Sequence, residues 1–177
     1  MLYYYKTHWG KQMEQTPIIR PRNFLFEFIV IIEELLIIII WWLFLRSWIY
    51  ALLAGIITYL ALAWTLRLTL QRHHRKGMKL MCAKQFSEAA DAFKNSFDFF
   101  QKHSLIDRFR FITMFASSAI PYKEMALNNL GICYLHMNEN KKALNTFLKL
   151  AEINPKYPYI SQTIDQIKIH INESQNQ

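Results

Sequence analysis

Residues 24–66 form an almost wholly apolar block, and this block constrains the fold more than any other feature of the chain. Its only charged members are Glu27, Glu33, Glu34 and Arg46. A helix needs about 20 apolar residues to cross the ~30 Å hydrocarbon core of a bilayer. The block is too long for one span and long enough for two, with Phe24–Leu45 as the first, Arg46–Ser47 as the turn and Trp48–Leu66 as the second. We therefore expect an integral membrane protein with an N-terminal transmembrane hairpin.

Two other interpretations of the block fit the sequence less well. A cleaved signal peptide has an apolar core of about 7–15 residues followed by small residues at the cleavage site, and this block is much longer. A helical hairpin buried in a soluble protein would carry apolar residues on one stripe only, whereas residues 37–45 have no polar face. Membrane insertion is the favoured interpretation.

The distribution of Lys and Arg predicts the orientation of the hairpin. Segment 1–23 carries four basic residues and one acidic one, segment 67–84 carries six basic residues and no acidic one, and the turn carries Arg46 alone. Short loops rich in Lys and Arg stay on the cytoplasmic side. We predict that both termini are cytoplasmic, best suited to a bacterial inner membrane, with an organelle surface as the alternative. Aromatic residues that favour membrane interfaces cluster near the turn, at Trp41, Trp42, Trp48 and Tyr50, and Trp64 marks the opposite interface.

The net charge of +8 belongs mainly to the segments that flank the block. Residues 85–177 are nearly neutral, with ten basic and nine acidic side chains. Each basic residue near an anionic leaflet contributes ~1 kcal/mol, so the charge predicts contact with lipid headgroups and not with nucleic acid. His73 and His74 lie in this basic flank without further ligands at metal-binding spacing, and we expect both to be solvated.

The glutamates in the apolar block need compensation, because a carboxylate at the bilayer centre costs at least ~2.5–3.5 kcal/mol. Folding about the turn brings Glu27 level with Arg67 and Glu34 level with Tyr59, which predicts an ion pair and a hydrogen bond. Glu33 points about 100° away from Glu34. Three uses stay open: internal pairing, with the first span starting late; pairing with a transmembrane partner or a second copy of this chain; or an ion or proton pathway, for which one hairpin is small.

The chain from residue 68 to residue 172 reads as helical, since Gly and Pro are few and apolar residues recur at spacings of three and four. The expected fold is all-α. Residues 124–157 carry, at the 34-residue spacing of a helical repeat, Leu127 at position 4, Leu130 and Gly131 at 7 and 8, Tyr134 at 11, Ala143 at 20, Phe147 at 24 and Pro155 at 32. This segment resembles the tetratricopeptide repeat (TPR) family. Small residues at positions 8 and 20 let the two helices of a repeat touch, aromatic side chains fill the space between them, and the proline stops the second helix.

A second segment, 70–103, matches the same pattern less completely. It has Gly77 at position 8, Leu80 at 11, Ala89 at 20 and Phe93 at 24, and departs from it at positions 4, 7, 27 and 32. The basic segment 67–84 thus runs into the first repeat of a TPR-like domain over 70–172. Because no Gly or Pro separates residue 56 from residue 76, the second span and the first repeat helix could form one continuous helix.

Residues 104–123 form an insert between the repeats, with a short helix expected near Asp107. Ile160, Ile164, Ile167 and Ile171 make residues 158–172 an amphipathic closing helix, followed by a tail over 173–177. Repeat stacks usually need three or more units. We therefore expect the insert, the membrane surface or a second copy to cover one exposed face.

The resemblance to TPR proteins implies protein–protein binding along the inner face of the first helix of each repeat. Carried over to this chain, that face consists of Gln71, His74, Met78, Met81 and Cys82 in the first repeat and Met125, Asn128, Ile132, Leu135 and His136 in the second, with Asn129 as a further candidate to hold a peptide backbone. The set is rich in methionine, which adapts to irregular partners. A helix or an apolar strip of a partner protein is the expected ligand, although any of these residues could instead pack against the insert or the cap.

The sequence gives no support for catalysis. A glycine-rich phosphate loop, an HExxH motif and a nucleophile elbow are all absent from it. Cys82 and Cys133 fall on expected repeat helices, where thiols pack as small hydrophobes, and a reducing cytoplasm disfavours a disulfide. We expect no enzyme, cofactor or metal. Two functions remain: a membrane-anchored adaptor that recruits a cytoplasmic protein, or a small integral subunit that assembles with another membrane protein through its hairpin.

Overall fold

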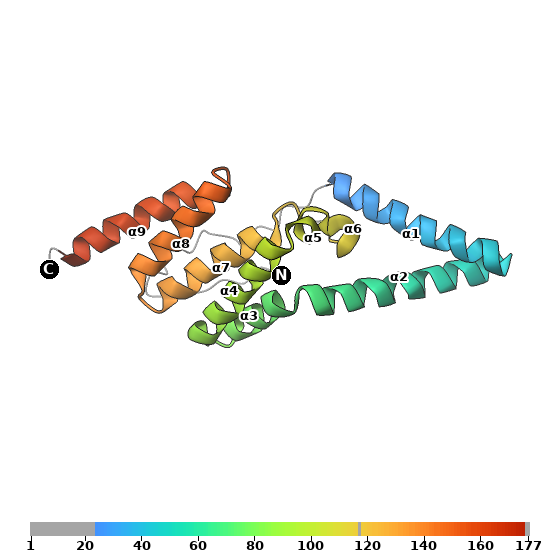
Figure 1. Cartoon of the computed structure of the whole chain (residues 1–177), viewed down its shortest axis with the longest axis horizontal. Helices are drawn as coiled ribbons and strands as arrows, with labels where there is room; N and C mark the ends of the chain where they lie inside the picture. Colours follow the sequence, from blue (N-terminus) through green and yellow to red (C-terminus); the bar gives the residue numbers. More distant parts are fainter. Residues whose placement is uncertain (1–23, 117, 176–177) are drawn as a thin grey trace. The chain divides into compact units, whose positions relative to one another are not determined.

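The computed structural model describes residues 24–116 and 118–175, and these residues form nine helices and no β-strand (Figure 1). The expectation of an all-α fold is confirmed. The helices are α1 (Phe24–Leu45), α2 (Trp48–Leu70), α3 (Arg72–Cys82), α4 (Phe86–Lys102), α5 (Ser104–Arg108), α6 (Arg110–Thr113), α7 (Tyr122–His136), α8 (Asn140–Ile153) and α9 (Ile160–Gln175). The predicted N-terminal segment 1–23 lies outside the described residues.

The described chain divides into two compact units. The hairpin unit contains residues 24–72 and 102–121, and the helix-pair unit contains residues 73–101 and 122–175. Within the described residues the chain passes from one unit to the other three times, after residues 72, 101 and 121. The segment expected as an insert in the repeat domain therefore belongs with the hairpin.

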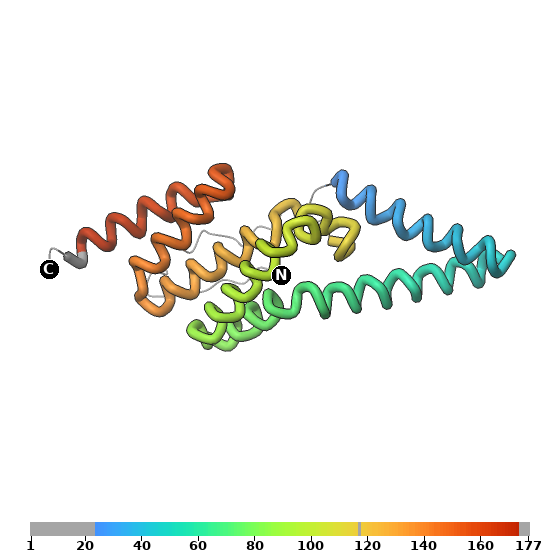
Figure 2. The backbone as a smooth tube through the Cα atoms, viewed as in Figure 1, coloured from blue at the N-terminus to red at the C-terminus, as the bar shows by residue number. Residues whose placement is uncertain are grey.

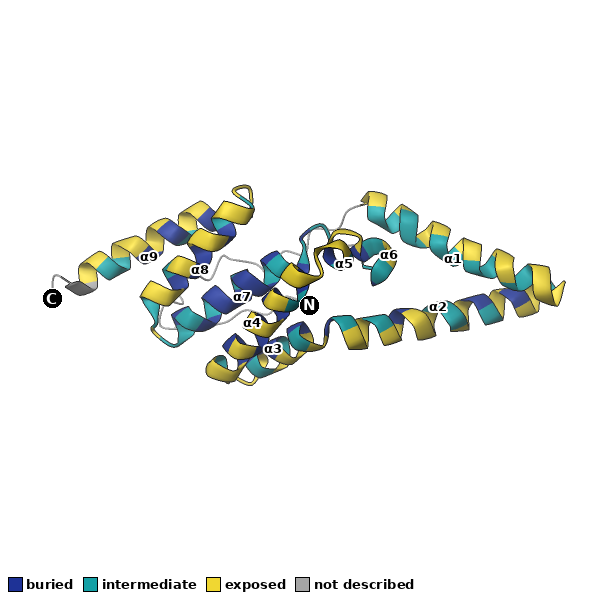
Figure 3. Ribbon diagram, in the orientation of Figure 1, coloured by how far each residue is buried: buried dark blue, intermediate teal, exposed yellow. Residues whose placement is uncertain are grey.

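In the hairpin unit, α1 and α2 are both long and apolar enough to cross a membrane. The first helix has the predicted bounds, and the second begins where predicted but continues past residue 66 to Leu70. The turn between them is possible because Arg46 adopts φ 53° and its N–H donates to the Trp42 carbonyl at 2.9 Å. Exposed residues recur along both helices (Figure 3), and many of them are large and apolar.

The two long helices approach most closely near their turn and diverge away from it (Figure 2). A Cβ added to Gly55 would lie 3.1 Å from the Ile38 Cα and 2.5 Å from its Cγ1, and Ala51 is fully buried. The small residues at 51 and 55 therefore form the close-contact face that their spacing predicts. Trp41 donates its indole N–H to the Thr58 hydroxyl at 3.0 Å across the same contact.

Where α1 and α2 diverge, residues from the 102–121 segment pack against both of them. Phe111 stacks on Phe26 of α1 with ring centroids 4.6 Å apart, and Phe115 meets Tyr59 of α2 edge to face at 5.0 Å. The aromatic insert thus packs against α1 and α2, within the hairpin unit.

The expected continuous helix from residue 56 to residue 76 is not formed, because it breaks at Gln71. This residue has φ −97° and ψ 11°, outside the helical region, and separates α2 from α3. Its buried side chain donates to the Met114 sulfur at 3.7 Å. The helix thus breaks where Gln71 contacts the 102–121 segment, and the absence of Gly and Pro near this position gave no indication of the break.

In the helix-pair unit, α3 with α4 and α7 with α8 form two antiparallel pairs, and α9 follows them. Side chains of α3, α4 and α7 share one apolar cluster, which includes Met81, Phe93 and Cys133. A second cluster joins α7, α8 and α9. Ile160, Ile164 and Ile167 of α9 are buried in it, as the predicted closing helix requires. Helix α8 ends at Ile153, two residues before Pro155.

Candidate partner-binding surface

The two helix pairs share one close contact, between a glycine on the first helix and a phenylalanine on the second. A Cβ added to Gly77 would lie 2.8 Å from the Phe93 ring, and one added to Gly131 would lie 2.6 Å from the Phe147 ring. In each pair the phenylalanine follows the glycine by 16 positions. Only a residue without a side chain allows this approach, so the glycine sets the separation of the two helices.

The turns inside the pairs also match. Lys84 and Asn138 each follow the glycine by seven positions and adopt φ 61° and φ 59°. The N–H of the next residue then donates to an equivalent carbonyl, from Gln85 to Leu80 and from Glu139 to Tyr134, at 2.9 Å in both cases. A left-handed residue with this bond is a common helix ending. The two helix pairs therefore share the same turn geometry and the same glycine–phenylalanine contact, at positions 54 apart.

The residues predicted to line the inner face of the pairs are not all accessible. Cys82 is exposed, while Met78, Met125, Asn128, Ile132 and His136 are partly exposed. Met81 and Leu135 are 1% and 3% exposed and belong to the two apolar clusters. Asn129 is buried, and its side-chain amide donates to the Met78 sulfur at 3.5 Å. Burial at these three positions assigns them to packing within the helix pairs.

His74, which we expected to be solvated, is 4% exposed. Its ring meets Phe93 at 5.5 Å and Tyr122 at 5.4 Å, both edge to face. The basic residues around His74 suggested a solvated side chain. The contact with Tyr122 could not be predicted, because Tyr122 lies far away along the chain. His74 therefore packs in the core of the helix-pair unit.

Burial shifts the pKa of two titratable side chains on α7, Cys133 and His136. His136 stacks on Phe86 with ring centroids 4.1 Å apart, and desolvation lowers its pKa. Burial raises the pKa of the Cys133 thiol to about 12. Since the thiolate is the reactive form, Cys133 behaves as a small hydrophobe, in line with its place in the apolar cluster.

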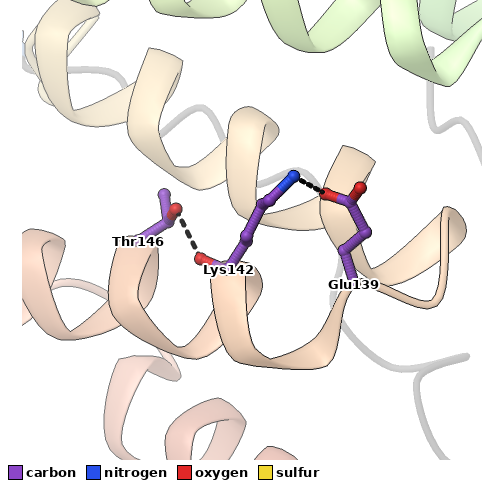
Figure 4. A network of polar contacts seen from close by, with 3 residues as sticks. All are labelled: Glu139, Lys142 and Thr146. Atoms are coloured by element: carbon purple, nitrogen blue, oxygen red, sulfur yellow. Dashed lines mark hydrogen bonds and ion pairs between the residues drawn. The ribbon is translucent and has the colours of Figure 1, made fainter.

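The first turn of α8 carries a short polar network (Figure 4). The Lys142 ammonium lies 2.9 Å from a Glu139 carboxylate oxygen, and the Thr146 hydroxyl donates to the Lys142 carbonyl at 2.8 Å. The hydrogen bond to Glu139 is the main reason why the pKa of Lys142 is raised. Lys142 is exposed and also lies over the Tyr134 ring at 5.7 Å. A solvated pair of this kind contributes little to stability.

The polar residues of the hairpin form contacts different from those predicted. Arg67 does not pair with Glu27; it donates to the carbonyls of Phe115 at 2.7 Å and Met114 at 3.3 Å. Tyr59 packs on Phe115, and no hydrogen bond joins it to Glu34 in the described chain. Both predictions failed because they considered the two helices without the segment that packs between them.

Sequence reasoning missed the residue that organises that segment, Arg110. This side chain is 5% exposed and donates to three backbone carbonyls, those of Ser118 at 2.7 Å, Asp107 at 3.0 Å and Ala119 at 2.7 Å. The available signal was an arginine set among phenylalanines in an apolar stretch. Among the described residues, no group of three or more His, Cys, Asp or Glu side chains could hold a metal ion.

Comparison with known proteins adds no relative: no protein-family profile, curated protein or solved structure matches this chain.

Proposed function

We propose that this chain is a membrane-anchored protein-binding module, in which a TPR-like pair of helical repeats recruits a partner to the membrane that the hairpin spans. The observation that carries the proposal is the repeated unit joined to two apolar helices of membrane-spanning length. Stacked repeats form an extended surface, which repeat proteins use for binding.

The TPR assignment rests on positions that share one physical cause. The contact between Gly131 and Phe147 and the contact between Gly77 and Phe93 occupy positions 8 and 24 of the pattern. Ala143 and Ala89, at position 20, are both fully buried. All three positions fix how closely two antiparallel helices pack, so their agreement in both copies supports the family resemblance.

The surface available to a partner is narrower than the full predicted face. It consists of Cys82 with the partly exposed residues Met78, Met125, Asn128, Ile132 and His136. Two methionines and an isoleucine fit an apolar strip on the partner, and the Asn128 amide can hold its backbone. Met125 is the best single probe, because it is partly exposed and belongs to neither apolar cluster.

The test is site-specific photo-crosslinking of the full chain in native membranes. We expect a photoreactive residue at Met125 to form a defined protein adduct, and the same residue at Leu148, on the exposed side of α8, to form none. Introducing Asn128→Lys should abolish the Met125 adduct, whereas Lys149→Gln should leave it. Adducts confined to the hairpin would refute the adaptor function.

One observation favours the second function, a small integral subunit. The Glu33 Oε2 atom is buried and has no hydrogen-bond partner in the described chain. A carboxylate within a membrane-spanning helix carries a high free-energy cost unless a hydrogen-bond donor from another helix pairs with it. Under this function a photoreactive residue at Ile40, exposed on α1, forms the adduct, and Glu33→Gln changes its yield.

A further inference from the structure

The segment formed by α5 and α6 has its polarity reversed relative to a surface helix in water. Leu105, Phe109 and Ile112 are 67%, 43% and 50% exposed. Leu105 lies in α5, Ile112 lies in α6, and Phe109 lies at the joint between the two helices. By contrast, Asp107 and Arg110 are 2% and 5% exposed. Charged residues are almost never fully buried while large apolar neighbours face water.

Two polar side chains of this segment, Arg110 and Thr113, have hydrogen-bond acceptors close by in the chain. Arg110 directs its guanidinium to the three backbone carbonyls named above, and Thr113 donates its hydroxyl to the Ile106 carbonyl at 2.8 Å. These bonds connect α5 and α6 to Ser118 and Ala119 around the buried Arg110 side chain. Leu105, Phe109 and Ile112 remain exposed on this segment.

This element is attached to the parts of α1 and α2 that lie away from their turn. Arg110 lies over the Phe26 ring at 5.4 Å, next to the stacked rings of Phe26 and Phe111, and Arg67 holds the carbonyls of Met114 and Phe115. Phe26 lies in the first turn of α1, and Arg67 lies in the last turn of α2. Exposed Phe109 meets Phe111 edge to face at 6.1 Å, and Phe111 stacks on Phe26, so the exposed apolar residues adjoin the hairpin at the end opposite its turn.

We propose that α5 and α6 form an interfacial membrane element, which lies in the headgroup region with Leu105, Phe109 and Ile112 inserted toward the acyl chains. The occupant of this apolar surface is lipid. A surface that adjoins two lipid-facing helices meets the same solvent as they do. Lys102 and Arg108 are exposed beside it, and long basic side chains extend to anionic headgroups while their stems remain on apolar surface. This inference rests on the proposed membrane anchoring.

The test uses the full chain with Cys82→Ser, reconstituted in vesicles of zwitterionic and anionic phospholipid. A nitroxide spin label is attached in turn to Leu105→Cys and Ile112→Cys, and collisions with oxygen, which concentrates in the acyl region, are compared with those of a water-soluble nickel chelate. Ile40→Cys in α1 is the lipid-facing reference, and Ser161→Cys, exposed on α9, is the aqueous reference. Buried Cys133 provides only the background measured in the parent protein.

We expect the oxygen-to-nickel collision ratio at residues 105 and 112 to exceed that at residue 161 severalfold and to lie nearer that at residue 40. A ratio equal to that at residue 161, with residue 40 still in lipid, would overturn the interfacial element and leave the anchor intact. Spin–spin broadening with protection from both reagents would assign the surface to a second copy and also overturn it. A collision ratio at residue 40 equal to that at residue 161 would refute the proposed membrane anchoring itself.

Discussion

The contact between Gly131 and Phe147 makes a quantitative prediction about the Gly131→Ala substitution. The new Cβ would lie 2.6 Å from the Phe147 Cζ, whereas ordinary contact begins at 3.4 Å, so the ring would have to retreat by about 0.8 Å. Phe147 is 2% exposed inside an apolar cluster, so a shift of its ring would disturb its packed neighbours. Forcing one methyl group into such a core costs ~1–3 kcal/mol.

Helix propensity acts in the opposite direction. Replacing glycine by alanine within a helix gains ~1 kcal/mol. The net effect on the helix pair is therefore a destabilisation of about 1 kcal/mol, with an upper limit near 2 kcal/mol. In a Phe147→Leu background the ring is gone and only the propensity gain remains, so Gly131→Ala should there stabilise the protein. The sign of the effect should thus depend on the partner residue.

Cys133 provides the assay, because it lies two residues from Gly131 on the same helix and is fully buried. Its pKa of about 12 keeps it protonated as well as inaccessible, so a thiol reagent modifies it only when α7 opens. With Cys82→Ser in the full chain, Gly131→Ala should accelerate modification about 5-fold and at most about 30-fold. Asn145→Ala, exposed on α8, is the control for propensity alone and should not accelerate it.

The refuting result is equally specific. If Gly131→Ala slows modification in the parent protein, or accelerates it as much in the Phe147→Leu background, then the ring contact does not set the helix separation. The structural argument for two copies of one repeat would then lose its main support.

Three further predictions concern the hairpin and pH. Gly55→Val should weaken the hairpin by ~1–3 kcal/mol, because its side chain would meet the Ile38 backbone; SDS unfolding followed by tryptophan fluorescence measures this, and an unchanged midpoint would contradict it. Arg67→Gln should remove the hydrogen bond to the Phe115 carbonyl, at a cost of roughly 1 kcal/mol. Backbone amides around Phe115 should then exchange hydrogen severalfold faster, while those of α8 should be unaffected. Burial lowers the pKa of His136 in the folded protein. As the pH falls, the imidazole therefore becomes protonated in the unfolded chain before it does in the folded one, so the free energy of unfolding is unaffected by His136 above about pH 6.5 and declines below it. Urea unfolding at about pH 7.5 and 5.5 should show this decline, and His136→Gln should reduce it.

The sequence predicted best those features that depend on residues close together along the chain. The bounds of α1 and the start of α2 follow from local patterns of apolar residues and from the turn at Arg46. The contacts of Arg67, Tyr59 and Gln71 could not be predicted, because each of them meets Met114 or Phe115, more than 40 positions away. A pattern that pairs two helices contains no information about a third element that packs between them.

The same limit applies to the candidate binding face. Position numbers within a repeat placed the candidate residues on α3 and α7, but they could not separate Met125, which stays partly exposed, from Leu135, which is 3% exposed. Burial depends on which neighbouring helices cover a position. Leu135→Glu would accordingly disrupt the core of α7 and α8, and it cannot serve as a probe of partner binding.

The position of the insert explains how two repeats can be neighbours in space although 54 positions separate them. Cys133 and Leu130 of α7 share an apolar cluster with Met81 and Phe93 of the first pair, as adjacent repeats in a stack would. Residues 102–121 loop out between α4 and α7, and their contacts are made within the hairpin unit. Loop-closure entropy rises only slowly with length, so the stack loses little stability through the interruption. The segment leaves the helix-pair unit after residue 101 and the chain re-enters that unit at residue 122, so the described chain passes between the two units at three points.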